Sequence, residues 1–447
     1  RLPMDGYSMT DSPSHWDKIR PQFDALPYPN HPLEKHPGRD SNYLAKHNYT
    51  IPYYLRNHQV VDSTDKWILD AGCGSGFKLL ALAIANPGAN LVGVDISPKS
   101  LEMAQQRLDY HKVSNPFALH CLPIEALDTL PYSFDYINCD DVLYLLEDPA
   151  AGLAAMRSVL NSEGIIRANM HSALQRADYY RMQKFWAKVG CLEGSATSEE
   201  MAVVRQTMAT LEDWVLAKEQ TWMPAFETDD QRLLMNHLFR GDTGITMADF
   251  STLLQRAGLE FISMVNWRQW NLEELFKNIE DLPIAVALNI ASMTLEEQLY
   301  LFELLNPIHR LLDLYCGHPG QGRDRPPVED WPDELWPNTM VHLHAQLNTA
   351  AFRACLEASA ENLGLLPLDQ YLKVDGQPIG VDSSFSSCLY ILFSGPQSVA
   401  ALVQRWQQAC PLDLITLQPI PVERAFQTVQ DFLMGLEKAG YIMLETP

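Results

Sequence analysis

The chain has 447 residues, more than a single hydrophobic core usually holds, so two or three domains are expected. Hydrophobic residues make up 47% of the chain and aromatic residues 10%, which excludes a disordered or fibrous protein. Lys and Arg number 33 against 56 Asp and Glu, and the formal net charge of -23 argues against a surface that follows phosphate backbones. Nucleic acid is therefore not an expected partner.

The cysteines and the hydropathy pattern bear on metals and location. Eight cysteines are scattered singly, without a C-x-x-C pair or a histidine at zinc-ligand spacing, which predicts a reducing compartment and no metal. His342 and His344 lack further ligands and are not expected to hold a metal. No run of about 18 apolar residues could span a bilayer, and Arg1 to Asp5 lack the layout of a signal peptide. We expect a cytoplasmic protein without a membrane partner.

The first part of the chain changes character near residue 60. Residues 1–60 are rich in Pro, His, Tyr and Asn and are expected to form an N-terminal arm with short helical pieces. From Trp67 onward, apolar runs of strand length alternate with helical patterns. The predicted strands are 67–70, 91–95, 117–122, 134–139 and 164–170, and the predicted helices are 77–85, 98–111 and 148–160. This alternation is typical of an α/β, doubly wound, Rossmann-like sheet, assigned here to residues 61–175.

Beyond residue 172 the pattern becomes mainly helical. Helices are predicted at 173–189, 198–218, 229–239, 247–257 and 295–314, in a middle substrate or regulatory domain of residues 176–325. The charged, proline-rich stretch 321–337 is expected to be a linker. Residues 338–447 carry helical patterns at 349–363, 398–408 and 421–439 and a last strand after Gly440, which suggests a winged-helix-like module. A homodimer is a candidate assembly.

The strongest motif is Asp70-Ala71-Gly72-Cys73-Gly74-Ser75-Gly76, between a predicted strand and a predicted helix. Glycines let the backbone approach a ligand closely, and a helix start offers N–H groups to a carboxylate. Asp70 complements an ammonium by charge, and the methionine tail of S-adenosylmethionine (SAM) carries both groups. A dinucleotide fingerprint G-x-G-x-x-G counted from Gly72 would need glycine at Phe77, and a G-x-x-x-x-G-K phosphate loop is absent.

A second acid supports this interpretation. Asp95 ends the next predicted strand, about twenty residues after the glycines, where a carboxylate can accept hydrogen bonds from both ribose hydroxyls. Two acids at consecutive strand ends around a glycine loop are more specific than either one alone. The alternatives are a glycine turn that serves only chain geometry and a solvated Asp95 that starts a helix.

Over about residues 60–170 the sequence resembles the class I SAM-dependent methyltransferases. Its glycine motif and Asp95 match the family's first motif and ribose-binding acid. Phe134 to Asn138 match its fourth strand, and Asn161 to Gly164 match the turn before its fifth strand. The resemblance implies SAM as cofactor, S-adenosylhomocysteine (SAH) as product and no metal. The cofactor residues that it implies are Asp70, Ala71, Gly72, Cys73, Gly74, Gly76, Asp95, Ile96, Ile124 and Glu125.

One position departs from the family pattern. The family often has Asp where Pro123 stands, within a segment whose residues Ile124 to Leu127 match the adenine-contacting part. The resemblance therefore leaves the adenine amino group to the Ile124 backbone or to Glu125.

Outside the core the resemblance is looser. Pro27 to Pro29 and His36 to Arg39 look like the leader of methyltransferases that carry a regulatory middle domain. Leu253 to Phe261 and Gly395 to Ser398 are similar to parts of the same group, whose layout is shared with bacterial protein-lysine methyltransferases and ends in a winged-helix part.

Methyl transfer from a sulfonium is an in-line displacement, which requires alignment of donor and acceptor. A base is needed when the acceptor is a protonated amine or a hydroxyl. Four residues at the carboxyl ends of the fourth and fifth strands are catalytic candidates, with helix capping or loop bonding as the alternative: Asp140, Asp141, Tyr144 and His171. In the arm, Tyr28, Tyr53 and Tyr54 are candidates to close over the substrate, with helix packing as the alternative.

The sequence thus predicts a SAM-dependent methyltransferase that acts on an N or O acceptor. A protein lysine would suit the acidic surface and the multi-domain layout, whereas a small metabolite would suit an enclosed pocket. The alternative is a SAM-binding regulatory protein without turnover.

Overall fold

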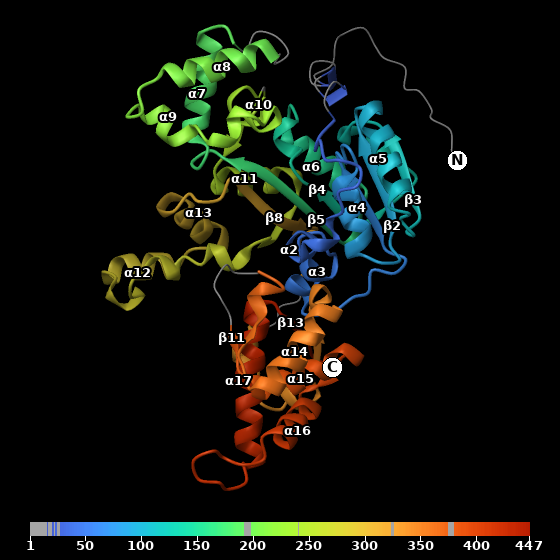
Figure 1. Ribbon diagram of the computed structural model, residues 1–447, viewed down its shortest axis with the longest axis vertical. Helices are drawn as coiled ribbons and strands as arrows, with labels where there is room; N and C mark the ends of the chain where they lie inside the picture. The colour runs from blue at the N-terminus through green and yellow to red at the C-terminus, as the bar shows by residue number, and fades with distance from the viewer. Residues whose placement is uncertain are drawn as a thin grey trace.

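A mixed β-sheet forms the centre of the computed structural model (Figure 1), which describes residues 16, 20–21, 23–24, 27–191, 198–239, 241–322, 326–373 and 380–447. Arg1 to Asp5, used above in the argument on signal peptides, lie outside the described residues. The strand order is β3-β2-β1-β4-β5-β8-β7, and β6 pairs with β5 beside this path. The strands of this sheet are β1 (Trp67–Ala71), β2 (Asn90–Asp95), β3 (Phe117–Cys121), β4 (Phe134–Cys139), β5 (Leu160–Ser172), β6 (Gly244–Ile245), β7 (Glu260–Met264) and β8 (Leu311–Gly317).

The first five strands run parallel, which confirms the predicted doubly wound arrangement. Leu69 at the centre of β1 pairs with Val92 on one side and Ile137 on the other, so its apolar run is buried between neighbours. Asn161 to Gly164, expected as a turn before the fifth strand, lie instead within β5, where the pairing register with β4 shifts. The carboxyl ends of β1, β2, β4 and β5 consequently meet at one edge of the sheet.

The last two strands of the sheet come from the region predicted to be mainly helical. β8 runs antiparallel to β5 and β7 runs antiparallel to β8. The predicted helix 295–314 is wrong in its second half, because α13 ends at Leu305 and β8 begins at Leu311. Pro307 lies between them, and a proline cannot continue a helix. The sheet is therefore completed by chain that returns after residue 244.

Helices cover both faces of this sheet. Leu79 and Leu80 of α4 share one apolar core with Leu108 of α5, on the face that the arm also covers. Leu153 of α6 and Phe250 of α11 belong to the core on the other face. These four helices are α4 (Phe77–Ala85), α5 (Pro98–Tyr110), α6 (Pro149–Ser158) and α11 (Met247–Ala257).

The remaining helices of the middle region extend the second core without adding a sheet of their own. The predicted helix 198–218 is split into α8 and α9, with a turn at 211–215 between them. Buried Trp186 and Val204 belong to the same cluster as the sheet residue Ile166. The helices are α7 (Ala177–Lys188), α8 (Ser198–Thr210), α9 (Leu216–Thr221), α10 (Asp230–His237), α12 (Ile284–Ala291) and α13 (Leu295–Leu305).

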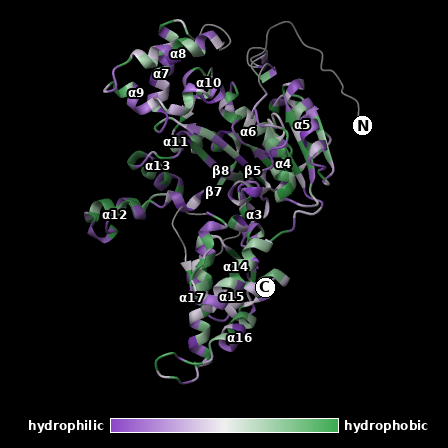
Figure 2. Cartoon of the chain, in the orientation of Figure 1, coloured by the Kyte–Doolittle hydropathy of each residue, from purple (hydrophilic) through white to green (hydrophobic). Residues whose placement is uncertain are grey.

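A separate core lies in the C-terminal part, which Figure 1 shows below the sheet. Figure 2 shows hydrophobic residues around α4, beside the central sheet, and over α14 to α16 in the C-terminal part. β12 and β13 flank β9 in an antiparallel sheet, and β10 pairs with β11. The elements are β9 (Met340–Leu343), α14 (Ala350–Asn362), β10 (Leu366–Pro367), β11 (Gly380–Val381), α15 (Ser386–Ile391), β12 (Gln397–Ser398), α16 (Val399–Ala409), α17 (Val422–Ala439) and β13 (Ile442–Glu445).

Two expectations for this part have different outcomes. The stretch 321–337 was expected to be a linker, but Val328, Trp331 and Trp336 are buried in the C-terminal core. Their large apolar side chains explain why the described residues 326–337 pack despite the prolines. The winged-helix assignment stays a prediction.

The N-terminal arm packs against the glycine motif. It contains a short 3₁₀ helix at Pro37–Arg39, α2 (Ser41–Ala45) and α3 (Thr50–Asn57), as expected for short helical pieces. The buried Arg107 guanidinium donates to the carbonyl oxygens of His31, Pro32 and Ser75 at 2.9–3.0 Å. One side chain of α5 thus joins the arm to the glycine loop. Within the described residues, no helix is long and apolar enough to cross a membrane.

Candidate active site

The glycine motif forms a tight loop between β1 and α4. Gly72 and Gly74 have φ values of 80° and 51°, in the left-handed region that glycine adopts most readily. A Cβ on Gly72 would meet Val142 Cγ2 at 2.5 Å, and a Cβ on Gly74 would collide with the carbonyl oxygen of Tyr28. The loop therefore requires glycine at both positions because other segments approach it closely.

Asp95 is bound directly to this loop. Its Oδ2 accepts a hydrogen bond from the Gly74 N–H, and its Oδ1 accepts one from the Ser97 N–H, each at 2.9 Å. Burial raises the pKa of Asp95, and these backbone hydrogen bonds oppose the rise. The carboxylate is thereby fixed at the end of β2 beside the loop, the place predicted for the ribose-binding acid.

Asp70 lies at the end of β1 and is almost fully buried. Its Oδ1 accepts a hydrogen bond from Asn138 Nδ2 at 2.8 Å, whereas its Oδ2 is buried without a hydrogen-bond partner among the described residues. Burial raises the pKa of Asp70 to about 7. A buried carboxylate oxygen without a partner is costly unless a ligand supplies a donor, and the ammonium of SAM is such a donor.

A cavity lies over this loop and contacts most of the predicted cofactor residues. Val94, Leu122, Val142 and Leu145 supply apolar wall. Trp16, Phe23 and Pro29 of the arm also line it, as does Lys78 of α4. The predicted site residues in its lining are Tyr28, Gly72, Cys73, Gly74, Asp95, Ile96, Ile124, Asp140 and Asp141.

The other predicted cofactor residues do not line the cavity. Asp70 and Ala71 are buried in β1, and Gly76 begins α4 in close approach to Ala104 of α5. Glu125 is exposed at the start of a 3₁₀ helix. Of the two residues expected at the adenine end, Ile124 lines the cavity and Glu125 does not.

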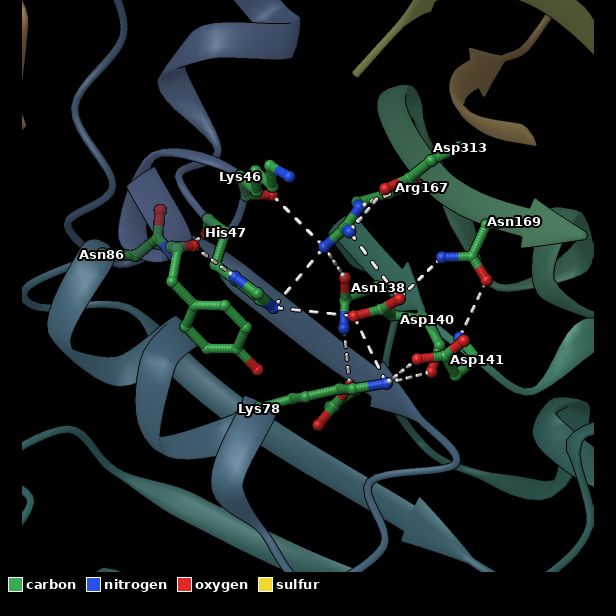
Figure 3. Close-up of polar contacts among 12 residues, drawn as sticks. Lys46, His47, Lys78, Asn86, Asn138, Asp140, Asp141, Arg167, Asn169 and Asp313 are labelled. Atoms are coloured by element: carbon green, nitrogen blue, oxygen red, sulfur yellow. Dashed lines mark hydrogen bonds and ion pairs between the residues drawn. The ribbon is translucent and has the colours of Figure 1, made fainter. Parts of the chain in front are cut away.

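Asp140 lies in a buried cluster of charged groups (Figure 3). Lys78 Nζ donates to the Asp140 carbonyl oxygen and lies 3.3 Å from its Oδ2, while Asn169 Nδ2 donates to its Oδ1 at 2.6 Å. Burial favours the neutral form of Asp140, but Arg167 and Lys78 outweigh burial and lower its pKa well below the usual range. His47, beside Arg167, is buried and has its pKa lowered to about 3.

Arg167 on β5 connects this cluster to β8, the neighbouring strand of the sheet. Its guanidinium binds both carboxylate oxygens of Asp313 on β8, at 3.0 and 2.7 Å, and donates to Asn138 Oδ1 at 3.2 Å. Asn138 in turn donates to Asp70. The orientation of Asp70 thus depends on a chain of contacts that begins on β8.

Asp141 occupies the wall of the cavity between two cations. Its carboxylate lies 3.6 Å from Lys78 Nζ and 3.3 Å from the Arg310 guanidinium. Its φ of 59° is unusual for a residue other than glycine, and the Asn169 side-chain oxygen accepts from its N–H at 2.8 Å. Strained backbone of this kind is held in place by its surroundings and is common at functional sites.

His171 and Tyr144 lie behind Asp141 and do not line the cavity. Their rings are stacked, with centroids 4.1 Å apart. His171 Nδ1 bonds Asp242 Oδ1 at 2.6 Å, and its Nε2 bonds Arg310 at 2.9 Å. Because arginine can only donate, Nε2 accepts and Nδ1 carries the proton. Both ring nitrogens are therefore occupied, and the structure brings Asp141, not His171, to the cavity.

The three arm tyrosines have different positions. Tyr28 lines the cavity, and burial together with Asp141 raises its pKa. Tyr53 packs near Tyr49, with its hydroxyl 3.4 Å from Glu163 at the start of β5. Tyr54 donates to Glu437 Oε1 at 2.8 Å and accepts from the Leu444 N–H at 3.1 Å. The structure thus does not bring Tyr53 or Tyr54 to the cavity, because both lie on α3 and pack away from it.

Sequence reasoning missed Lys78, Arg167 and Arg310. Lys78 is the one charged residue of the apolar helix Phe77–Ala85, and Arg167 is the one charged residue in the apolar run 164–170. Such isolated charges in buried elements need partners, and this signal could have indicated them. Arg310 stands in an irregular segment before β8 and carried no such signal.

No cluster of three or more His, Cys, Asp or Glu suitable for a metal ion is present in the part of the chain that the structure describes. His342 Nε2 pairs with Glu445 Oε2 at 3.1 Å, and His344 is buried.

The fold and the site have the features expected of a class I SAM-dependent methyltransferase, and the comparisons with known proteins support the methyltransferase part of that expectation. Residues 62–230 match a family described as "Methyltransferase domain". The chain is similar in fold to PKMT2 from Rickettsia typhi, solved in complex with AdoHcy, with 18% identity, a TM-score of 0.57 and coverage of 89% of this chain and 76% of that one. The chain therefore carries a methyltransferase domain in residues 62–230.

The similar sequences differ in how much of this chain they match. An uncharacterized protein of Synechococcus sp. is 26% identical over 70% of this chain and 72% of its own length. A ubiquinone biosynthesis O-methyltransferase of Idiomarina loihiensis is 38% identical over 23% of this chain. That match spans 40% of the relative's length. A ubiquinone biosynthesis O-methyltransferase of Neisseria meningitidis is 32% identical over 25% of this chain, and the match spans 46% of its length.

Proposed function

We propose that this chain transfers the methyl group of SAM to a nitrogen or oxygen acceptor, and that the residues around the glycine loop hold the cofactor. The buried Asp70 Oδ2 that lacks a hydrogen-bond partner among the described residues carries this proposal. Asp70 directly precedes the loop that requires glycine, and Asp95 is hydrogen-bonded to the same loop. Asp95, in the cavity lining, fits the ribose, and we assign the ammonium to Asp70, which is buried two residues before the lining residue Gly72.

The carboxylate of the cofactor has a different partner from the one expected. The N–H groups of Gly72 and Cys73 both donate to the Val94 carbonyl, and that of Ser75 donates to Tyr28. These loop donors are already used within the protein. Lys78 is the cation among the described lining residues, and we assign the cofactor carboxylate to its ammonium, which would then be shared with Asp140 and Asp141.

On the acceptor side, the structure favours alignment over covalent chemistry. SAM supplies a methyl group on a positively charged sulfur, which an acceptor lone pair can displace in line. Asp141 and Tyr28 line the cavity and can hold the acceptor hydroxyl or amine by hydrogen bonds. His171 is a positioning residue that fixes Arg310 against Asp141. A His171→Gln variant should slow transfer without moving the pH profile, whereas loss of one limb of that profile would make His171 the base.

The acceptor class remains part of the proposal. The likeness to ubiquinone biosynthesis O-methyltransferases supports an oxygen acceptor, and a protein lysine or another small metabolite are the alternatives. The cytoplasmic location and the homodimer stay predictions from the sequence.

Incubation of the purified protein with methyl-labelled SAM tests the function. A labelled small product or labelled protein supports transfer and separates the two acceptor classes. SAH binding without any transfer to a broad acceptor panel would favour a SAM-binding regulatory protein. Absence of SAH binding in calorimetry would overturn the proposal itself.

A further inference from the structure

A second cavity of about 380 Å³ adjoins the first one. The two cavities share Tyr28, Pro29, Lys78, Asp140 and Asp141 in their linings. The groups assigned to the acceptor therefore face both spaces. A molecule in the second cavity could reach Tyr28 and Asp141 without entering the cofactor cavity.

Aromatic rings form much of the wall of the second cavity. The rings of His31 and Phe77 meet edge to face at 4.6 Å, and Tyr43 lies 5.7 Å from Phe77. Tyr28 closes the inner end. Such walls favour planar, apolar groups.

The mouth of this cavity is basic in a chain with a net charge of -23. Lys35 and Arg39 are exposed there, and neither has a carboxylate ion-pair partner among the described residues. Lys35 instead lies 3.1 Å from a ring nitrogen of His31 and over the Phe77 ring. His36 also lines this cavity, but burial lowers its pKa and its Nδ1 accepts from the Gly38 N–H, so it adds no charge at neutral pH.

One carboxylate lies beside these two cations, because Asp40 also lines the second cavity and is exposed. Asp40 Oδ1 accepts from the Tyr43 N–H at 2.9 Å and caps α2. Glu34 interacts with Arg107. At the inner end, Asp140 and Asp141 face Lys78, as described above.

From this arrangement we propose that the second cavity is the acceptor subsite and takes a small planar acceptor whose anionic group lies at Lys35 and Arg39. This inference rests on the proposed function. The acceptor hydroxyl or amine reaches Tyr28 and Asp141 at the inner end. Its lone pair forms the new bond to the methyl carbon, the carbon–sulfur bond breaks with its electron pair left on sulfur, and the acceptor proton passes to Asp141 or water. A cationic lysine side chain would be repelled at the mouth.

Binding of 4-hydroxybenzoate and of its neutral analogue 4-hydroxybenzamide, measured by calorimetry on the full chain with SAH bound, tests the inference. The carboxylate should bind about five- to tenfold more tightly, because charge-assisted hydrogen bonds at an exposed mouth contribute on the order of 1 kcal/mol. Its advantage should shrink with added salt. SAH binding is measured first, so failure there belongs to the proposed function and not to this subsite.

The variant Lys35→Ala/Arg39→Ala should abolish the preference for the carboxylate while SAH affinity stays unchanged. The double variant Lys99→Ala/Lys277→Ala removes the same charge from exposed positions outside the second cavity and should keep the preference. Equal binding of the two probes, no binding of 4-hydroxybenzoate at millimolar concentration, or an unchanged preference in Lys35→Ala/Arg39→Ala would each overturn the inference.

Discussion

The two ends of the candidate active site are built in different ways. The cofactor end is formed by residues 70–95, a stretch in which backbone N–H groups and glycine conformations fix the geometry. The acceptor end contains Asp141 and Arg310, and the adjoining buried cluster joins Asp140, Arg167 and Asp313, all from widely separated parts of the chain. Ion pairs between side chains, rather than backbone conformation, hold this second end together.

This difference implies different responses to mutation. Loss of a cofactor contact should weaken one ligand and leave the fold intact, because the loop is held by backbone bonds. Loss of one ion in the buried cluster should destabilise the whole chain, since its partners would then be uncompensated charges. The predictions below test this contrast, from the largest expected effect to the smallest.

Arg167→Met should give the largest effect. The change leaves Asp313 without its two guanidinium bonds and removes one of the cations beside Asp140. Breaking a buried pair of this kind costs about 3–5 kcal/mol of unfolding free energy, measured by urea denaturation. Arg353→Ala, at an exposed position on α14, should change stability by less than about 0.5 kcal/mol. A double variant Arg167→Met/Asp313→Leu that is no more stable than Arg167→Met would contradict the charge argument.

Asp95→Asn should chiefly affect cofactor affinity. Two hydrogen bonds from ribose hydroxyls to a carboxylate are worth about 3 kcal/mol together, so SAH should bind about 100-fold more weakly in calorimetry. The melting temperature of the free protein should also fall, because an amide has one acceptor oxygen for the two N–H groups of Gly74 and Ser97 that the carboxylate binds. Asp128→Asn, an exposed acid outside the cavity lining, is the matched control. Unchanged SAH affinity in Asp95→Asn would remove this residue from the site.

The cofactor end was predictable because its signals are local. The apolar run before Asp70, the glycines and Asp95 lie within one strand-helix-strand unit, so the sequence pattern contains their spatial relation. The five parallel strands were predicted for the same reason. Within that unit, the pattern did not indicate Lys78, which lines the cavity and to which we assign the cofactor carboxylate in place of the loop N–H groups.

The acceptor end was only partly predictable because its partners come from distant segments. Asp140 and Asp141 follow a predicted strand and were identified, whereas Arg310 precedes β8, a strand hidden in a pattern that predicted a helix. His171 was expected as a base from its position on the rim. The contacts of Asp242 and Arg310 with its two nitrogens support the positioning role that we propose for it.

The raised pKa of Asp70 predicts a pH dependence of SAH binding at the cofactor end. Its pKa of about 7 lies above the unfolded value near 3.9, so the free protein loses stability from this group as pH rises from about 4 to 7. The ammonium of SAH requires the charged carboxylate, so SAH affinity should increase about fivefold from pH 6 to pH 7, with release of a proton. Calorimetry in buffers of different ionisation enthalpy measures that release. Asp70→Asn should bind SAH more weakly and show no such proton release, while proton release that persists in this variant would assign the titration to another group.

A matched pair of arm tyrosines gives the smallest and most selective test. Tyr54→Phe removes the hydroxyl that binds Glu437 and the Leu444 N–H, which should lower the unfolding free energy by about 1 kcal/mol and leave SAH affinity unchanged. Tyr28→Phe removes a hydroxyl at the shared wall of the two cavities, so methyl transfer should slow while stability and SAH affinity stay close to those of the parent. The two variants differ from the parent by one oxygen each and should show opposite patterns. If Tyr54→Phe instead slowed transfer at full stability, the arm would contact the acceptor through α3. The placement of Tyr54 outside the two cavities, in contact with the C-terminal part, would then be wrong.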